Sequence, residues 1–332
     1  MTLFNPSLSR RALLAGGGAL ALAGCGERQR PFFSAEAHPG DYPTTLAVEA
    51  MGRMLAERSD GRLAIRIYSG GQLGGERDTL ELTMFGGIDM NRVNLAPLNS
   101  FAPDTALLSL PFLFRSVAHS RRAMDGAPGE AILESLTPHG LIGLCFYDSG
   151  ERSFYTTRRP IETPADMRGL KIRVQNSDLY VSLVEGLGGN ATPMDYGEVY
   201  QGLMQGVIDG AENNWPSYES SRHFEAARYF SLTNHVMAPE VLVMSARTWA
   251  GIGEADRALI RECARDSVPI MREIWDARVE ASRERVIAAG VQVNEIEDLE
   301  PFADMMRPVW DRFVRTDHQR DLLAQIEQMA GE

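Results

Sequence analysis

The stretch Leu63-Ala64-Ile65-Arg66-Ile67-Tyr68 decides the fold class, because its alternation of residues is typical of a strand with one buried face. A helix is predicted before it, over residues 42–58, where apolar residues recur at helical spacing. A glycine-rich loop, Gly70–Gly75, follows it, and a second helix and a second strand are predicted over residues 76–85 and 90–96. This order of elements predicts an α/β fold, in which helices cover the faces of a sheet.

The rest of the chain continues the alternation of helices and strands. Helices are expected over residues 117–135, 178–187, 198–208 and 301–329, and strands over 141–147, 153–157, 170–174, 191–194 and within 229–245. Residues 255–289 predict one long helix, because helix-forming residues fill the segment and Pro269 is its only proline. At a rise of ~1.5 Å per residue this helix would be about 50 Å long, more than the width of one lobe.

Length and composition favour a globular protein with two lobes. Roughly 300 residues remain once an N-terminal signal is set aside, which is more than one core usually holds. Apolar residues make up 44% of the chain and charged residues 23%, and both are ordinary fractions. We expect lobe I over residues 38–149, with about 237–268 returning to it, and lobe II over 150–236, with part of 269–332 packing on it. The net charge of −12 argues against nucleic acid as a partner.

The N-terminus has the features of a cleaved export signal. Ser9-Arg10-Arg11 precedes a short apolar run that ends at Ala23, and paired arginines in this position are typical of the twin-arginine pathway. The run ends in Leu22-Ala23-Gly24-Cys25, which resembles a lipoprotein processing site. We therefore expect removal of residues 1–24, lipidation of Cys25, a tether over residues 25–37, and a periplasmic body that meets the membrane only through the lipid. The alternative is a soluble secreted protein cut nearby, with Cys25 incidental.

No motif in the chain promotes an enzyme. The Gly70–Gly75 loop lacks the lysine and Ser/Thr of a phosphate-binding loop, and no serine lies in a G-x-S-x-G motif. The six histidines form neither H-E-x-x-H nor a Cys/His pair, so neither a metal site nor a cofactor is expected. Cys145 lies in an apolar strand-like run and Cys263 in a helical one, which predicts two buried free thiols rather than a disulfide.

Two arginines stand out by their positions. Arg173 lies within the predicted strand Leu170–Val174, and an arginine in mid-strand is costly to bury unless it is paired. Arg152 lies at the entrance of the second lobe, directly after a predicted strand of the first. Arg173 either meets a structural acid or solvent, or offers its planar guanidinium as a bidentate partner for a ligand carboxylate.

A polar and aromatic cluster follows a predicted helix at Asn213-Asn214-Trp215-Pro216-Ser217-Tyr218. The adjacent amides offer both donors and acceptors, and the aromatic faces could pack on the C–H groups of a sugar. The alternative is a polar turn with Trp215 in the core.

Several short segments resemble, in their order and spacing, the TRAP-transporter solute-binding family, the DctP-like periplasmic receptors. They are Lys171-Ile172-Arg173, Thr192-Pro193-Met194, Gly197-Glu198-Val199-Tyr200, the run from Gln205 to Asn213, and Ala238-Pro239-Glu240-Val241-Leu242. His38-Pro39, the run from Gly71 to Gly74 and the turn from Gly87 to Met90 are similar to it as well. The resemblance covers nearly all of the mature chain.

The resemblance implies a fold like that of type II periplasmic binding proteins, with two α/β lobes around a cleft, a hinge of crossing strands and a long helix that spans both lobes. It implies that Arg173 pairs with a substrate carboxylate, joined by Arg152 and Asn213. The Asn-Asn-x-Pro-Ser-Tyr pattern is similar to that of the branch that binds uronates and aldonates. Candidates for hydroxyl or stacking contacts are His38, Glu76, Arg92, Asn94, Asn214, Trp215, Tyr218 and Glu240.

The function implied is that of a receptor and not of an enzyme. It would capture a sugar acid outside the inner membrane and deliver it to the permease subunits of a TRAP transporter. The alternatives are a receptor for a C4-dicarboxylate or another organic acid, a ligand-sensing module for a membrane kinase, and a lyase on a related fold.

Overall fold

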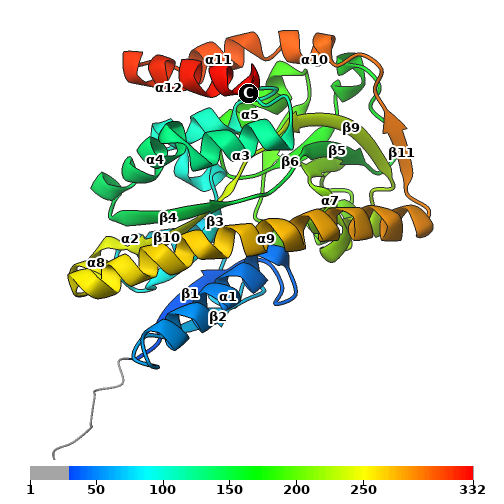
Figure 1. Ribbon diagram of the computed structural model, residues 1–332. Coiled ribbons are helices and arrows are strands. Elements are labelled where there is room, and N and C mark those ends of the chain that lie inside the picture. The colour runs from blue at the N-terminus through cyan, green and yellow to red at the C-terminus, as the bar shows by residue number, and fades with distance from the viewer. Residues whose placement is uncertain (1–29, 332) are drawn as a thin grey trace, which may run out of the picture.

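The strands form two sheets, and the computed structural model describes residues 30–331 (Figure 1). The first sheet has the order β2 (Ile65–Tyr68), β1 (Phe32–Glu36), β3 (Met90–Asn94), β10 (Glu240–Ser245) and β4 (Leu141–Tyr147). The second has the order β11 (Gln292–Glu295), β9 (Tyr229–Val236), β5 (Arg152–Thr156), β8 (Gly210–Asn213), β6 (Lys171–Val174) and β7 (Asn190–Pro193). We use lobe I for the first sheet with its helices and lobe II for the second. The α/β prediction is confirmed.

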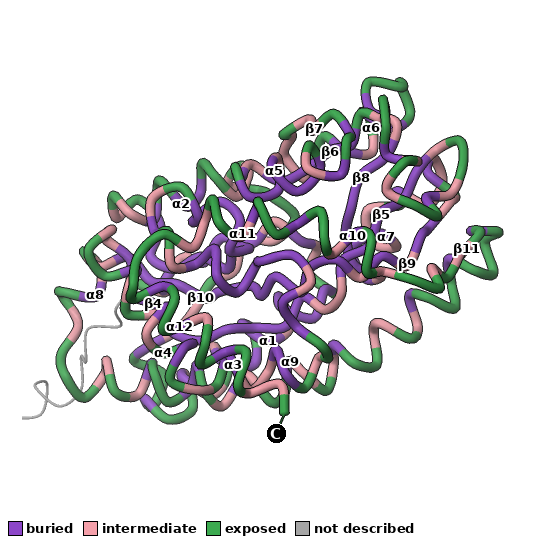
Figure 2. Tube along the Cα trace, turned by 90° about the horizontal axis from the view of Figure 1, so that it is seen from above, coloured by how far each residue is buried: buried purple, intermediate pink, exposed green. Residues whose placement is uncertain are grey.

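Helices cover the sheets and join the lobes. They are α1 (Pro43–Arg58), α2 (Glu76–Met84), α3 (Val117–Asp125), α4 (Ala127–Glu134), α5 (Asp178–Gly186), α6 (Val199–Met204), α7 (Trp215–Ser220), α8 (Ala246–Ala250), α9 (Glu254–Ala288), α10 (Glu300–Asp304), α11 (Arg307–Phe313) and α12 (Asp317–Gln328). Figure 2 shows that the central strands, such as β4, β8 and β10, are buried, whereas the outer faces of the helices are exposed. No helix in residues 30–331 has both the length and the apolar character needed to cross a bilayer.

The long helix predicted from the sequence is confirmed as α9, which has 35 residues. It packs on α1 and β4 of lobe I and on α7 of lobe II, and in Figure 1 it runs across the molecule from α8 to the turn before β11. Its buried side chains include Cys263, Met271 and Trp275, which join the core of lobe I. Both Cys145 and Cys263 are buried free thiols, as expected.

The chain crosses between the lobes in two short connections, each of which joins the end of a strand in one sheet to the start of a strand in the other. It leaves lobe I after β4 and enters lobe II at Arg152, and it returns from β9 to β10 at Glu240. Gly150 makes the first crossing possible, because its φ of +60° favours glycine and an added Cβ would lie 3.1 Å from Trp275 of α9. Both crossings bring strand ends from the two sheets together. Polar residues at those ends therefore face the space between the lobes.

Three sequence expectations are wrong in detail. The tether expected over residues 25–37 does not extend over residues 32–36, because these form β1, which pairs with β2 and β3 and is largely buried. The helix expected over 117–135 is divided at Gly126, whose extended backbone begins α4. The segment 301–329 forms three helices rather than one, and Thr316 caps the last of them. The export signal and Cys25 lie outside the described residues.

Candidate functional site

A narrow cavity lies between the two lobes. It measures about 20 Å³ and adjoins a wider groove of about 330 Å³. Its lining residues are Ala37, His38, Glu76, Asn94, Arg152, Arg173, Gln175, Tyr196, Asn213, Ser217 and Glu240. The residues predicted to bind a carboxylate, Arg173, Arg152 and Asn213, meet here. Four of the predicted hydroxyl partners also line the cavity: His38, Glu76, Asn94 and Glu240.

Arg173 is a buried cation that the described residues do not neutralise by an ion pair. It lies on β6, it is 3% exposed, and its Nε donates a hydrogen bond to the backbone oxygen of Met194 at 2.8 Å. Its two terminal nitrogens have no hydrogen-bond partner within residues 30–331. Burial lowers the pKa of Arg173 from its ordinary value, but an arginine remains protonated in a folded protein. The side chain therefore presents an uncompensated positive fork to the cavity.

Arg152 is also buried, but an acid compensates it. Its Nε and Nη2 donate to the Glu212 carboxylate at 2.5 and 2.8 Å. Burial alone would lower the pKa of Arg152, but the neighbouring Glu212 carboxylate raises it. Burial alone would raise the pKa of Glu212, but Arg152 and His235 lower it to about 2. The remaining nitrogen, Nη1, donates to Asn213 Oδ1 at 2.8 Å. Arg152 thus lines the cavity mainly as a group that positions Asn213.

Asn213 is held so that its amide donors are free. Its Oδ1 accepts from Arg152 and from the backbone N–H of Asn214. The Nδ2 group has no partner among the described residues and belongs to a side chain that lines the cavity. Asn213 can therefore donate hydrogen bonds to an oxygen-rich ligand next to Arg173.

The opposite wall carries carboxyl groups that converge on Arg92. The Arg92 Nε donates to Glu36 at 2.8 Å, its Nη2 also contacts Glu36, and its Nη1 contacts both Glu76, at 3.1 Å, and Glu240. The Arg92 side chain is fully buried and does not line the cavity. The structure therefore does not place Arg92 with the residues that line the cavity. It instead compensates the acids that do line the cavity.

The acids on this wall differ in their protonation. Burial, and then repulsion from Glu240, raises the pKa of Glu76 to about 8, whereas Arg92 lowers the pKa of Glu240 despite its burial. Asn94 Nδ2 donates to Glu240 at 3.1 Å. Glu76 is thus a neutral acid near pH 7, and Glu240 is a carboxylate. Together they offer both a donor and acceptors to ligand hydroxyl groups.

His38 contributes a neutral ring. It stacks on Tyr42 with centroids 3.8 Å apart, and burial lowers its pKa to about 4. Its Nδ1 is buried and has no partner among the described residues. A buried ring nitrogen without a partner is a natural contact for a ligand hydroxyl.

Three predicted contacts lie outside the cavity. Trp215 stacks on Phe230 with centroids 3.8 Å apart, and Tyr218 is fully buried and donates to the backbone oxygen of Ala227. Asn214 caps α7 by accepting from the Ser217 N–H, and it donates to the Ser149 backbone. The chain turns from β8 into α7 here, so Asn213 and Ser217 line the cavity, whereas Asn214, Trp215 and Tyr218 do not. Trp215 is partly buried and packs against the core of lobe II, which lies between the two interpretations of this segment, a ligand contact and a polar turn with Trp215 in the core.

Sequence reasoning missed Gln175, Tyr196 and Ser217. Gln175 follows Arg173 by two positions, so the alternation of a strand would have placed it on the same face. Its Nε2 is buried without a partner. Ser217 contacts the Tyr42 hydroxyl at 2.8 Å and so connects α7 to the start of α1. No local signal pointed to Tyr196, and Ser217 lies in the polar and aromatic cluster at residues 213–218 but was not singled out there.

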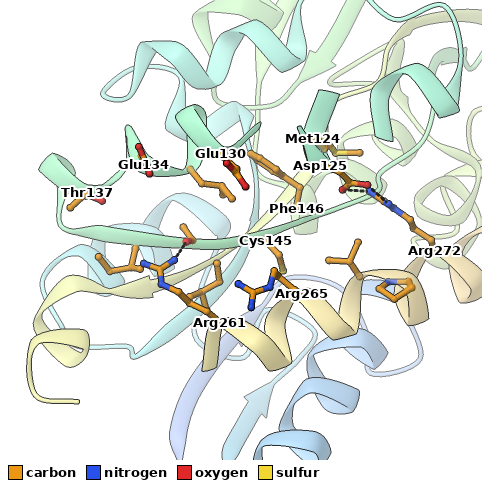
Figure 3. Close-up of a pocket in the computed structure, with 16 residues that line it drawn as sticks. Met124, Asp125, Glu130, Glu134, Thr137, Cys145, Phe146, Arg261, Arg265 and Arg272 are labelled. Carbon is orange, nitrogen blue, oxygen red and sulfur yellow. Dashed lines mark hydrogen bonds and ion pairs between the residues drawn. The ribbon is translucent and has the colours of Figure 1, made fainter. Parts of the chain in front are cut away.

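A larger cavity, of about 580 Å³, lies elsewhere, along β4 between α4 and α9. Figure 3 shows Arg261 and Arg265 rising from α9 and Glu130 reaching in from α4. None of the predicted site residues lines it, and all its walls belong to lobe I and the adjoining half of α9. Within residues 30–331 no group of three or more His, Cys, Asp and Glu is placed to hold a metal ion.

Comparison with known proteins gives consistent matches. The family model described as bacterial extracellular solute-binding protein, family 7 (DctP), matches residues 33–317. A solute-binding protein of Chromohalobacter salexigens is 45% identical over 278 residues, which cover 84% of this chain and 83% of that protein.

Solved structures are similar over most of the chain. A TRAP periplasmic solute-binding protein from Bradyrhizobium sp., in complex with α/β-D-galacturonate, has a TM-score of 0.89 and 50% identity and covers 90% of this chain and 100% of its own. A TRAP periplasmic protein from Chromohalobacter salexigens with bound D-glucuronate has a TM-score of 0.87 and 42% identity, with coverage of 90% and 99%.

Proposed function

The chain belongs to bacterial extracellular solute-binding protein family 7, and from that premise we propose that it binds a uronate between its lobes, where the narrow cavity adjoins the groove of about 330 Å³. Members of this family are receptors that capture solutes outside the cell membrane. The similar structures from Bradyrhizobium sp. and Chromohalobacter salexigens hold galacturonate and glucuronate. A sugar acid of this kind carries one carboxylate and several hydroxyl groups, which are the two kinds of group that the cavity is suited to bind.

The state of Arg173 is the observation that carries the proposal. A buried guanidinium whose two terminal nitrogens have no partner in the described part of the chain has the geometry for a bidentate bond to a carboxylate. Leaving such a group unpaired is costly, so an anion that pairs with it gains binding energy. Asn213 would donate to the same carboxylate or to a neighbouring ring oxygen.

The hydroxyl groups of the sugar would meet the wall of lobe I. Glu240 accepts, Glu76 can donate near pH 7, and the free Nδ1 of His38 and the amide of Asn94 add further contacts. Because the two walls belong to different lobes, a ligand that contacts both would favour the closed arrangement of the lobes. No bond of the ligand is broken in this scheme.

The closed receptor would deliver its ligand to the membrane permease subunits of a TRAP transporter. We propose that the twin-arginine signal exports the chain to the periplasm, and that lipidation of Cys25 holds it at the membrane surface. Mass spectrometry of the mature protein tests the anchor, since an unmodified N-terminus would refute it.

Thermal unfolding of the purified receptor with a panel of uronates, aldonates and dicarboxylates tests the function. A ligand at 100 times its dissociation constant should stabilise the receptor by about 2.7 kcal/mol. We expect stabilisation by D-galacturonate or D-glucuronate. A panel in which no sugar acid raises the unfolding temperature would contradict the proposal, and consumption of the ligand during the assay would indicate an enzyme.

A further inference from the structure

The charged groups around the cavity are divided unequally between the lobes. On the side of lobe I, three carboxyl groups, those of Glu36, Glu76 and Glu240, surround the single guanidinium of Arg92. One guanidinium compensates one carboxylate. Even when Glu76 holds a proton, this wall therefore keeps one negative charge in excess.

The side of lobe II has the opposite balance. Arg152 and Arg173 line the cavity, and Glu212 is the one carboxylate among the described residues that forms an ion pair with either of them. This wall therefore keeps one positive charge in excess. The cavity is thus positive at the end where a ligand carboxylate would bind and negative at the other end.

We propose that this division makes the receptor select acids with a single carboxylate, and that Glu240 is the residue that rejects a second one. This inference rests on the proposed function, because it assumes that the ligand carboxylate lies against Arg173. It separates the sugar monoacids from the corresponding dicarboxylic acids, and it argues against a C4-dicarboxylate as the ligand.

Among the described residues that line the cavity, none on the side of lobe I carries a positive charge that could neutralise a second carboxylate. All three nitrogens of the Arg92 guanidinium are already engaged with the acids, and the Asn94 amide already donates to Glu240. His38 is neutral, because burial lowers its pKa to about 4. A hydroxyl group can donate to Glu240, whereas a carboxylate at the same place would bring two like charges together in a buried space.

Beside Glu240, a ligand hydroxyl and a ligand carboxylate should differ greatly in binding free energy. Two like charges placed side by side in an interface cost several kcal/mol, which corresponds to about 100-fold or more in affinity. Arg173 cannot offset this cost, because it belongs to the other wall and one carboxylate already occupies its fork.

A pair of ligands tests the inference on the wild-type receptor. Galactarate and its monomethyl ester share the same open chain and hydroxyl groups and differ by one negative charge. Isothermal titration should give at least about tenfold tighter binding for the ester. D-galacturonate, measured in the same series, reports separately on the proposed function.

A substitution of Glu240 provides the second arm. Glu240→Gln removes the charge but keeps an oxygen for Arg92 and Asn94, so galactarate should gain at least about tenfold in affinity relative to D-galacturonate. Glu81→Gln is the matched control, because Glu81 lies on α2, is exposed and forms a pair only with Arg77 among the described residues. This control should leave the ratio of the two affinities unchanged.

The outcomes separate the two proposals. Equal affinity for galactarate and its monoester overturns the charge selection, even if D-galacturonate binds tightly. An unchanged affinity ratio in a folded Glu240→Gln protein overturns it as well. If no uronate binds to the wild-type receptor, the proposed function fails and the selection fails with it. The ester comparison needs no variant, so it decides the matter even if Glu240→Gln does not fold.

Discussion

Arg92 and Arg173 are both buried beside the same cavity, yet their surroundings are opposite. Arg92, on β3 of lobe I, has three carboxyl groups within ion-pair distance, whereas the side chain of Arg173, on β6 of lobe II, forms one hydrogen bond within residues 30–331, to a backbone oxygen. The guanidinium of Arg92 is paired with acids of the protein itself, whereas the terminal nitrogens of Arg173 are left to bind a ligand in the proposed function. Burial alone thus says little about the role of an arginine, because the acids placed beside it decide whether it holds the fold or binds an anion.

The largest effect should come from removing the compensated arginine. Arg92→Met leaves the buried acids without a cation, and breaking a buried ion pair in this way typically costs about 3–5 kcal/mol of unfolding free energy. Urea unfolding measures the loss. Arg159→Met is the control, because Arg159 is half exposed and pairs with Asp166 at the surface, where such pairs are worth about 0–1 kcal/mol. A loss below about 1 kcal/mol for Arg92→Met would show that the cluster does not stabilise the fold.

Replacing the available arginine should affect binding rather than stability. Arg173→Lys keeps the charge but loses the planar fork, so affinity for D-galacturonate should fall about 100-fold, or about 2.7 kcal/mol. The unfolding midpoint should change little, since Arg173 forms only the hydrogen bond to Met194 among the described residues. Titration calorimetry with Arg168→Lys, an exposed arginine of the same lobe, provides the control. Unchanged affinity in Arg173→Lys would remove Arg173 from the site.

The wall of lobe I should make binding depend on pH. The pKa of Glu76 is raised to about 8, so Glu76 is neutral near pH 7 and becomes a second excess carboxylate above pH 8. A bound anion favours the protonated form, so the complex holds its proton to higher pH than the free receptor. Affinity for a uronate should therefore fall as pH rises, by about tenfold between pH 7 and 9.

Glu76→Gln is the control for this pH dependence. Its side chain stays neutral, and the groups around it, Arg92, Glu240 and the Asn94 backbone N–H, remain in place. Its affinity for a uronate should be nearly flat over the same range. A wild-type affinity that is flat, or a Glu76→Gln variant that keeps the full slope, would assign the effect to another group.

The smallest effect on binding should come from Trp215. Its indole stacks on Phe230 and does not line the cavity. Trp215→Leu should lower the unfolding free energy by about 1 kcal/mol through loss of the stacked pair, and it should leave the dissociation constant of a uronate unchanged. A tenfold loss of affinity for a uronate in Trp215→Leu would show that Trp215 does contribute to ligand binding.

Much of the fold followed from local patterns. The alternation in Leu63–Tyr68, the apolar run over 141–147 and the helix-forming run over 255–289 appear as β2, β4 and α9 with small shifts at their ends. These elements were predictable because side-chain periodicity reflects which face of a strand or helix is buried. β1 was missed, because Ser34 and Glu36 make its sequence look polar. Glu36 is buried there beside Arg92, and its carboxylate also accepts hydrogen bonds from the His38 backbone N–H and the Thr44 hydroxyl.

The candidate site was predictable in part for the same reason. Arg173 stood out as a charge in mid-strand, and the order of short segments around it indicated a carboxylate partner. The separate roles of Arg92, Arg152 and Trp215 were not predictable. Arg152 pairs with Glu212, 60 positions away, and no local pattern marks that partner.

By itself, the sequence determined which residues alternate toward a buried face, where the long helix lies and which polar residues stand at strand ends. Only the tertiary structure decided the charge of each wall. Arg92 meets Glu36 across 56 positions and Glu240 across 148 positions, because β1, β3 and β10 are neighbours in one sheet. Electrostatic energy depends on distance in space and on burial, and separation along the chain reports neither.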